Sequence, residues 1–160
     1  PKKLEIQYFY FKKFNLDFLS TRSPIFLNNK YLIINTKKKL LNKILKYDLF
    51  SKNIVAHSSV MYNKKLAIYN EEILTNVDID IWLKLISQKI DLYFLNFSLT
   101  YIRRHNSQYF LENSRIQKFK YYLNSIKIRL YNAKKISDYF LIFFYVFRSL
   151  FLRSLNIIFR

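Results

Sequence analysis

Residues 75–104 read TNVDIDIWLKLISQKIDLYFLNFSLTYIRR, and their patterning changes from helical to strand-like in the middle. In 75–89, Trp82, Leu85 and Ile86 are spaced to share one side of a helix, which predicts that this side faces a core. Residues 90–104 are apolar, aromatic and rich in side chains that favour strands. This stretch therefore predicts a mixed α/β fold rather than an all-helical or all-β one.

The segments around this stretch alternate in the same way. Proline in the first turn and an apolar side formed by Leu4, Tyr8 and Phe11 predict a helix over 1–14. We further expect two strands in 16–36, a helix over 37–50, a buried strand-like segment over 54–62, and a basic, tyrosine-rich amphipathic helix over 112–132. The expected architecture is a mixed sheet flanked by helices, with a C-terminal amphipathic helical segment.

Composition narrows the function classes. At 160 residues and 51% hydrophobic content, the chain is long enough to bury a core. It contains no cysteine, which excludes disulfides, thiolate nucleophiles and cysteine-ligated zinc. It also contains no glycine, so it cannot hold a glycine-rich phosphate loop.

The formal net charge of +18 has two interpretations. One is an anionic partner, such as nucleic acid, anionic lipid or a phosphorylated substrate. The other is AT-rich coding, which favours Lys, Asn, Ile, Phe and Tyr and makes Gly, Pro and Ala scarce. Charge alone does not choose between them.

The last 22 residues, 139–160, are the most hydrophobic in the chain. Arg148 and Arg153 interrupt the apolar run, so it falls short of the roughly 18–20 apolar residues of a spanning helix. At 100° per residue, the two arginines share a sector with Ser149, and apolar residues occupy the opposite sector. An amphipathic helix lying in a membrane interface fits this pattern, and a terminal helix packed into the core is the alternative.

Four segments resemble, in order, motifs of inverting family-2 glycosyltransferases with the GT-A fold. They are 1–7 (PKKLEIQ), 53–61 (NIVAHSSVM), 77–85 (VDIDIWLKL) and 99–107 (LTYIRRHNS). The match is to the acceptor-side half, which follows the family's metal-binding DxD motif and nucleotide-binding half. The resemblance therefore implies that the chain is a fragment of a longer enzyme. Residues 1–110 would be the acceptor-side half of a GT-A-like domain, and 111–160 would be basic amphipathic helices.

The resemblance also implies an activity. The full-length enzyme would transfer a sugar, with inversion, from a nucleotide-sugar donor to a glycan or lipid-linked acceptor in cell-surface polysaccharide biosynthesis. A divalent metal, Mg²⁺ or Mn²⁺, would be its cofactor, with ligands mainly outside this fragment, so no metal ligand is assigned here. The fragment alone is expected to be inactive. The implied location is the cytoplasmic, inner face of the membrane, where an anionic surface would be a further partner.

The resemblance assigns the catalytic base to Asp78. The alternative is an ordinary helix start, because residues 75–78 fit a capping box. Asp80 lies about 200° further around the helix, so it is expected to be structural. The glutamate that precedes the base in the family is Val77 here, which removes an expected support of Asp78.

The resemblance places the remaining candidates at the substrates. His57, Ser58 and Ser59 would lie near the acceptor pocket, although a buried histidine is the alternative. Trp82 is either a wall of the acceptor site or core. Arg103 and His105 would meet the donor diphosphate, although a solvated basic turn is the alternative.

Two other functions compete with sugar transfer. A basic nucleic-acid-binding module would use Lys37, Lys38, Lys39 and the tyrosine-rich segment 118–131. The chain shows no recognised nucleic-acid-binding motif, and its charges are spread along the sequence, so we expect no specific nucleic acid partner. The second alternative is a non-catalytic membrane-interface protein, and its evidence is residues 139–160 alone.

Overall fold

The computed structural model describes residues 2–27, 30–31, 39–66, 69–73, 75–103 and 115–158. The helices are α1 (Lys2–Lys13), α2 (Lys46–Ser51), α3 (Val77–Ser87), α5 (Arg115–Asn132) and α6 (Ile136–Ile158), with short 3₁₀ helices η1 (His57–Ser59) and η2 (Lys64–Leu66). The strands are β1 (Phe18–Arg22), β2 (Ile25–Leu27), β3 (Lys30–Tyr31), β4 (Leu41–Ile44), β5 (Val60–Tyr62), β6 (Leu92–Ser98) and β7 (Ile102–Arg103).

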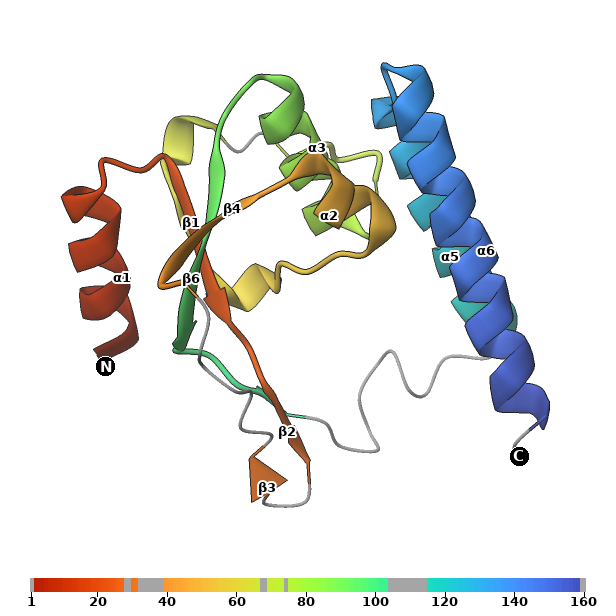
Figure 1. Ribbon diagram of the computed structural model, residues 1–160, viewed down its shortest axis with the longest axis horizontal. Coiled ribbons are helices and arrows are strands. Elements are labelled where there is room, and N and C mark those ends of the chain that lie inside the picture. Colours follow the sequence, from red (N-terminus) through yellow and green to blue (C-terminus); the bar gives the residue numbers. More distant parts are fainter. Residues whose placement is uncertain are drawn as a thin grey trace.

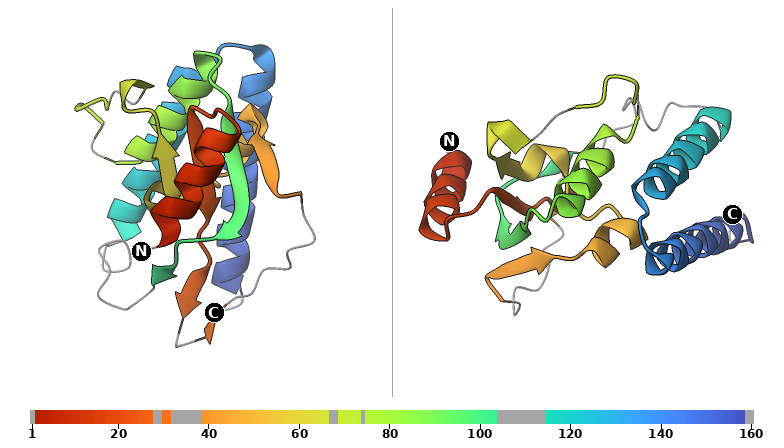
Figure 2. Two further views of the ribbon diagram at one scale, coloured as in Figure 1. Left: turned by 90° about the vertical axis from the view of Figure 1, so that its left-hand side faces the viewer. Right: turned by 90° about the horizontal axis from the view of Figure 1, so that it is seen from above.

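The strands form a mixed four-stranded sheet in the order β4-β6-β1-β5 and a smaller sheet in the order β3-β2-β7. In the larger sheet β1 and β6 are parallel, and β4 and β5 pair antiparallel to them at the two edges. Helix α1 lies on one side of this sheet, and α2, α3, α5 and α6 lie on the other (Figures 1 and 2). The predicted mixed α/β class, with helices flanking a mixed sheet, is confirmed.

The core lies between the four-stranded sheet and α3. Phe18 on β1 packs edge-on against Trp82, with ring centroids 5.0 Å apart, and both side chains are fully buried. Ile128 of α5 and Ile142 of α6 belong to the same buried cluster, so the C-terminal helices share the core of residues 1–103. Burial of this apolar surface is the main driving force for the fold.

One predicted helix is wrong. Residues 37–50 were expected to be helical, but in the described part, from residue 39 on, 41–44 form β4 and the helix α2 covers only 46–51. Leu41 pairs with Leu95 and Ile44 with Leu92, so the segment completes one edge of the main sheet. This pairing outweighs the helix propensity of the leucine- and lysine-rich segment.

Two other predictions are corrected in detail. Helix α1 exists, but Leu4 and Tyr8, on its predicted apolar side, are 64% and 56% exposed. The side facing the sheet carries Gln7, whose Nε2 donates to the carbonyl of Ser59 at 2.9 Å. In the predicted strand 54–62, residues 57–59 form η1, and only 60–62 are a strand.

The helices predicted near the C-terminus are present. Helix α5 covers 115–132 of the predicted 112–132, and α6 covers most of 139–160 and begins three residues earlier. Across the described ranges, we find no helix with the length and apolar character needed to cross a membrane.

Candidate functional site

The start of α3 is fixed by Asn76. Its backbone has φ 58°, in the left-handed region that asparagine tolerates better than most residues, and helix geometry begins at Val77. Its side-chain amide donates to the carbonyl of Tyr121 in α5 at 3.1 Å and caps no α3 amide. The hydroxyl of Thr75 instead accepts a hydrogen bond from Asn124. The capping box expected over 75–78 therefore does not form.

Asp78 is half-buried at the second position of α3. Its Oδ2 accepts a hydrogen bond of 2.7 Å from Nδ2 of Asn53, and Oδ1 has no partner in the part of the chain that the structure describes. The Oδ1 of Asn53 accepts from the amide of Val55 at 3.2 Å, so Asn53 is held at both ends. The start of a helix also favours a negative charge. The arrangement orients one carboxylate oxygen and leaves the other open.

A buried cation lies behind Asp78. Arg129 of α5 is 1% exposed and donates to the carbonyls of Leu49 and Phe50 at the end of α2. Its guanidinium stacks over the Tyr145 ring at 4.1 Å. Burial lowers the pKa of Arg129, and the charges of Tyr145 and Asp78 act in the opposite direction. The cation therefore joins α2, α5 and α6 and contributes a positive field at Asp78.

His57 is exposed at the start of η1, so the buried-histidine alternative is wrong. Its Nε2 lies 3.3 Å from the hydroxyl of Tyr69, which in turn lies 3.3 Å from the hydroxyl of Tyr62. The hydrogen bond to Tyr69, together with burial, raises the pKa of Tyr62 to about 12. His57 and Tyr69 together present aromatic rings and polar atoms at the surface.

Trp82 lies beneath this surface. Its ring is 6.1 Å from that of His57, but the side chain is fully buried, which agrees with the core interpretation. Within the described ranges its Nε1 has no hydrogen-bond partner. Any contribution of Trp82 to a substrate would act through His57 and Tyr69.

The two serines differ in access. Ser58 is exposed, and its carbonyl accepts a hydrogen bond from Nζ of Lys3 at 2.5 Å. Ser59 is fully buried, and its hydroxyl donates to the carbonyl of Ala56 at 2.7 Å. The hydroxyl of Ser59 thus closes the η1 turn, and only Ser58 is open to a ligand.

Asp80 has a structural environment. Its side chain is fully buried, its Oδ2 lies 2.6 Å from Nζ of Lys84, and its Oδ1 accepts from Nδ2 of Asn132 at 3.2 Å. The bond to Asn132 ties α3 to α5, whereas the pair with Lys84 lies within α3. Asp78 and Asp80 therefore have different partners, as their helical spacing predicts.

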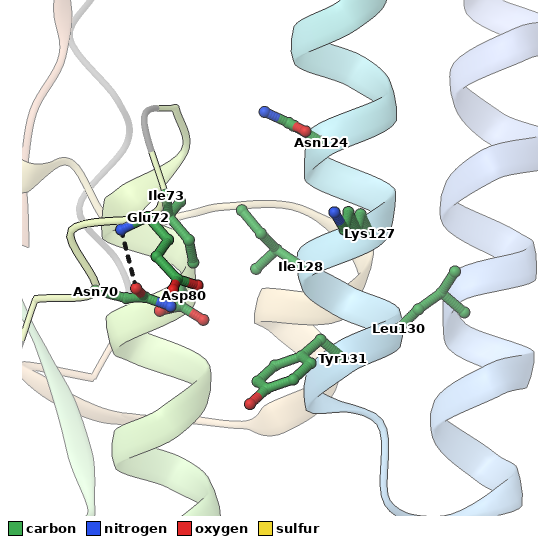
Figure 3. A pocket seen from close by; sticks show the side chains of 9 residues that line it. All are labelled: Asn70, Glu72, Ile73, Asp80, Asn124, Lys127, Ile128, Leu130 and Tyr131. Carbon is green, nitrogen blue, oxygen red and sulfur yellow. Dashed lines mark hydrogen bonds between the residues drawn. The ribbon is translucent and has the colours of Figure 1, made fainter.

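Asp80 also borders a cavity of about 480 Å³ between α3, α5 and the turn at 70–73. The cavity is lined by Asn70, Glu72, Ile73, Asp80, Asn124, Lys127, Ile128, Leu130 and Tyr131. In Figure 3, Ile128 and Tyr131 point from α5 toward α3, whereas Leu130 points away. Asp78 is not among the lining residues, so this cavity is distinct from the surface at Asp78.

The diphosphate candidates are only partly described. The backbone of Arg103 forms β7 beside β2 in the smaller sheet, but its side chain and the whole of His105 lie outside the described residues. Arg22, at the end of β1, is a cation that the sequence did not indicate. It is 9% exposed, and its Nε donates to Oδ1 of Asn96 on β6. The carboxyl ends of parallel strands are common ligand sites, which makes Arg22 a candidate for an anionic group.

The described residues contain no group of three or more histidine, aspartate or glutamate side chains that could hold a metal ion. The chain thus combines a mixed α/β fold with a carboxylate oriented by Asn53, and it carries an exposed aromatic surface at His57 and Tyr69. Comparison with protein-family models and with curated proteins finds no match to this chain.

Proposed function

We propose that the chain is the acceptor-side half of an inverting, family-2-like glycosyltransferase, which uses a nucleotide-sugar donor and a glycan or lipid-linked acceptor. The observation that carries this proposal is the carboxylate of Asp78, which Asn53 holds through one oxygen, while the other oxygen has no partner among the described residues. The order of the four motif-like segments supports it, because two of them, 53–61 and 77–85, meet at this hydrogen bond.

In the proposed reaction, Asp78 takes the proton from the attacking hydroxyl of the acceptor. The hydroxyl oxygen forms a bond to the anomeric carbon of the donor while the bond to the diphosphate breaks on the opposite face, which inverts the configuration. Asp78 lies in the first turn of α3, and the buried Arg129 places a positive charge near it.

The acceptor would lie against the surface formed by His57 and Tyr69, where aromatic rings and polar atoms are presented together. Ser58 adds an exposed hydroxyl beside His57. Donor phosphates would be met by Arg103 and His105, as the resemblance implies, with Arg22 as a further candidate. The metal that the resemblance implies finds no ligand set among the described residues, and no step here is assigned to it.

The proposal places the reaction at the cytoplasmic, inner face of a membrane. Its support is α6, which carries a row of exposed aromatic side chains along its outer side. A lipid-linked acceptor would be reached most readily by an enzyme held at that surface.

The test uses the full-length protein with a panel of nucleotide sugars and lipid-linked acceptors. We expect release of the nucleoside diphosphate together with a product whose anomeric configuration, read by NMR, is opposite to that of the donor. Replacing Asp78 with asparagine should abolish most of the release. Retained configuration, or full transfer by the Asp78→Asn variant, would overturn the proposal.

A further inference from the structure

The outer side of α6 is an apolar surface, which we term the aromatic ridge. Its members are each more than half exposed: Ile136, Tyr139, Phe140, Phe143, Phe144, Phe147, Leu150 and Phe151. The rings of Phe143, Phe147 and Phe151 stack in sequence along the helix, with centroid separations of 6.4 and 6.5 Å. Large exposed apolar patches mark interaction sites.

The fold fixes the direction of the ridge. On the opposite side of α6, Asp138 is 2% exposed and accepts hydrogen bonds from Nζ of Lys46 and from the amides of Lys134 and Lys135. Ile142, one turn further on, is 4% exposed in the core. The helix therefore cannot turn the ridge inward without breaking these contacts. Together with α5, α6 forms the side of the molecule away from α1 (Figure 2).

The charge around the ridge is positive. Residues 115–160 contain ten lysines and arginines, of which Arg129 is buried, and a single acidic residue, Asp138, which is buried and paired with Lys46. Lys134, Lys135 and Arg148 are exposed on α6 or just before it. A partner that binds this side of the molecule must therefore present apolar groups to the aromatic ridge and negative charge to the basic residues around the ridge.

We infer that the aromatic ridge docks on an anionic lipid surface, with α6 lying in the plane of the interface and its phenylalanines among the acyl chains. A bilayer rich in acidic lipids offers both kinds of group over the whole length of the helix. This inference rests on the membrane part of the proposed function and is independent of sugar transfer. To the proposed membrane location it adds the surface of the protein that docks and the class of lipid that it binds.

The experiment is co-sedimentation of the full chain with phosphatidylcholine vesicles made with or without phosphatidylglycerol. We expect binding to the vesicles that contain phosphatidylglycerol, weaker binding to the neutral ones, and loss of binding as salt is added. Replacing both Phe143 and Phe147 with serine removes two large apolar contacts and should weaken binding by at least about tenfold. Because both side chains are exposed, the variant should fold normally, which circular dichroism checks.

The matched control replaces Leu4 and Tyr8 of α1, which are similarly exposed, with serine; binding should not change. Equal binding by the ridge variant and the wild type would overturn the inference. Absence of vesicle binding by the wild type would also overturn the inference. In that case, a wild-type dimer that the ridge substitutions dissociate would show that the ridge binds a second copy of the chain instead. The Asp78→Asn variant should bind vesicles normally. Vesicle binding therefore tests the membrane inference independently of whether the catalytic proposal holds.

Discussion

The side-chain amide of Asn53 lies 2.7 Å from the carboxylate of Asp78, and it joins a loop before η1 to the first turn of α3. Val77 stands where the resembling family has a glutamate, and it cannot support the neighbouring aspartate through a hydrogen bond. Asn53 supplies a support from a different part of the chain. Because its Oδ1 is held by the amide of Val55, its donor group is aimed at Asp78 before any substrate arrives.

Asn53 should therefore be a positioning residue. Replacing it with alanine removes a hydrogen bond to a charged group, worth about 1.5–3 kcal/mol. In the full-length enzyme we expect kcat to fall by roughly 10- to 100-fold, with little change in the KM for donor. Steady-state kinetics measure both. Asn63 provides a control, because its side chain also accepts from the amide two residues on but, among the described residues, bonds no carboxylate; Asn63→Ala should leave kcat unchanged. An unaltered kcat in Asn53→Ala would contradict the assigned role.

Asp138 should make stability depend on pH. Burial acts to raise the pKa of Asp138, but its hydrogen bonds with Lys46 and with the amides of Lys134 and Lys135 outweigh this and hold the pKa below its usual value. A carboxyl group with a lowered pKa in the folded state contributes stability above its unfolded pKa, near 3.9, and loses it as the pH falls through the folded value.

We expect Asp138→Asn to lower the free energy of unfolding at pH 7 by roughly 1.5–3 kcal/mol. The difference from the wild type should shrink as the pH falls below about 4. Urea unfolding at both pH values measures this. Asp91→Asn is the control: Asp91 pairs with Lys43, but both side chains are half exposed, so its effect should be much smaller. A pH-independent difference for Asp138→Asn would mean that the charge of this carboxylate is not what stabilises the fold.

Arg129 should not be replaceable by lysine. The guanidinium of Arg129 donates hydrogen bonds to two carbonyls of α2 and one of α5, and its plane lies over the ring of Tyr145. Lysine keeps the charge but cannot match this planar geometry. We expect Arg129→Lys to lower the free energy of unfolding by roughly 2–5 kcal/mol. Thermal unfolding measures it, with Lys127→Arg at an exposed position of the same helix as the control. Equal melting temperatures would show that the planar contacts contribute little.

The sequence predicted most of the elements but not where each one packs. Trp82 and Leu85 were correctly placed on a buried side of a helix, because a periodic apolar pattern reports burial directly. Residues 41–44 were misassigned, because their leucines fit a helix and only pairing with β6 makes them a strand. Helix α1 was predicted, but its buried residue is Gln7, which donates a hydrogen bond to the carbonyl of Ser59 in η1, and hydrophobicity does not reveal such a contact.

The candidate site was predictable only in part. Spacing correctly separated the environments of Asp78 and Asp80, because two residues along a helix point in different directions. The roles of Asn53 and Arg129 depend on contacts 25 and more residues apart in the chain, which no local pattern shows. Ser58 and Ser59 show the same limit. The sequence assigned both hydroxyls to the acceptor pocket, but only Ser58 is exposed.

The sharpest prediction compares the two aspartates of α3 in the full-length enzyme. Asp78→Asn keeps the size of the side chain but removes the base, so transfer at saturating donor should fall by roughly 10²–10⁴-fold. Donor binding should change little, because the role proposed for Asp78 is on the acceptor. Asp80→Asn should retain nearly normal turnover but lower the melting temperature, because Lys84 loses the charge of its buried partner.

Turnover and melting temperature must be measured on both variants, because each readout isolates one role. Asp78 is half-buried with one oxygen open, so its replacement should affect rate more than stability. Asp80 is fully buried between Lys84 and Asn132, so its replacement should affect stability more than rate. If Asp80→Asn abolishes transfer while the protein remains stably folded, the base has been assigned two residues too early. If neither replacement slows transfer, Asp78 serves only to fasten α3 to Asn53, and the catalytic proposal fails.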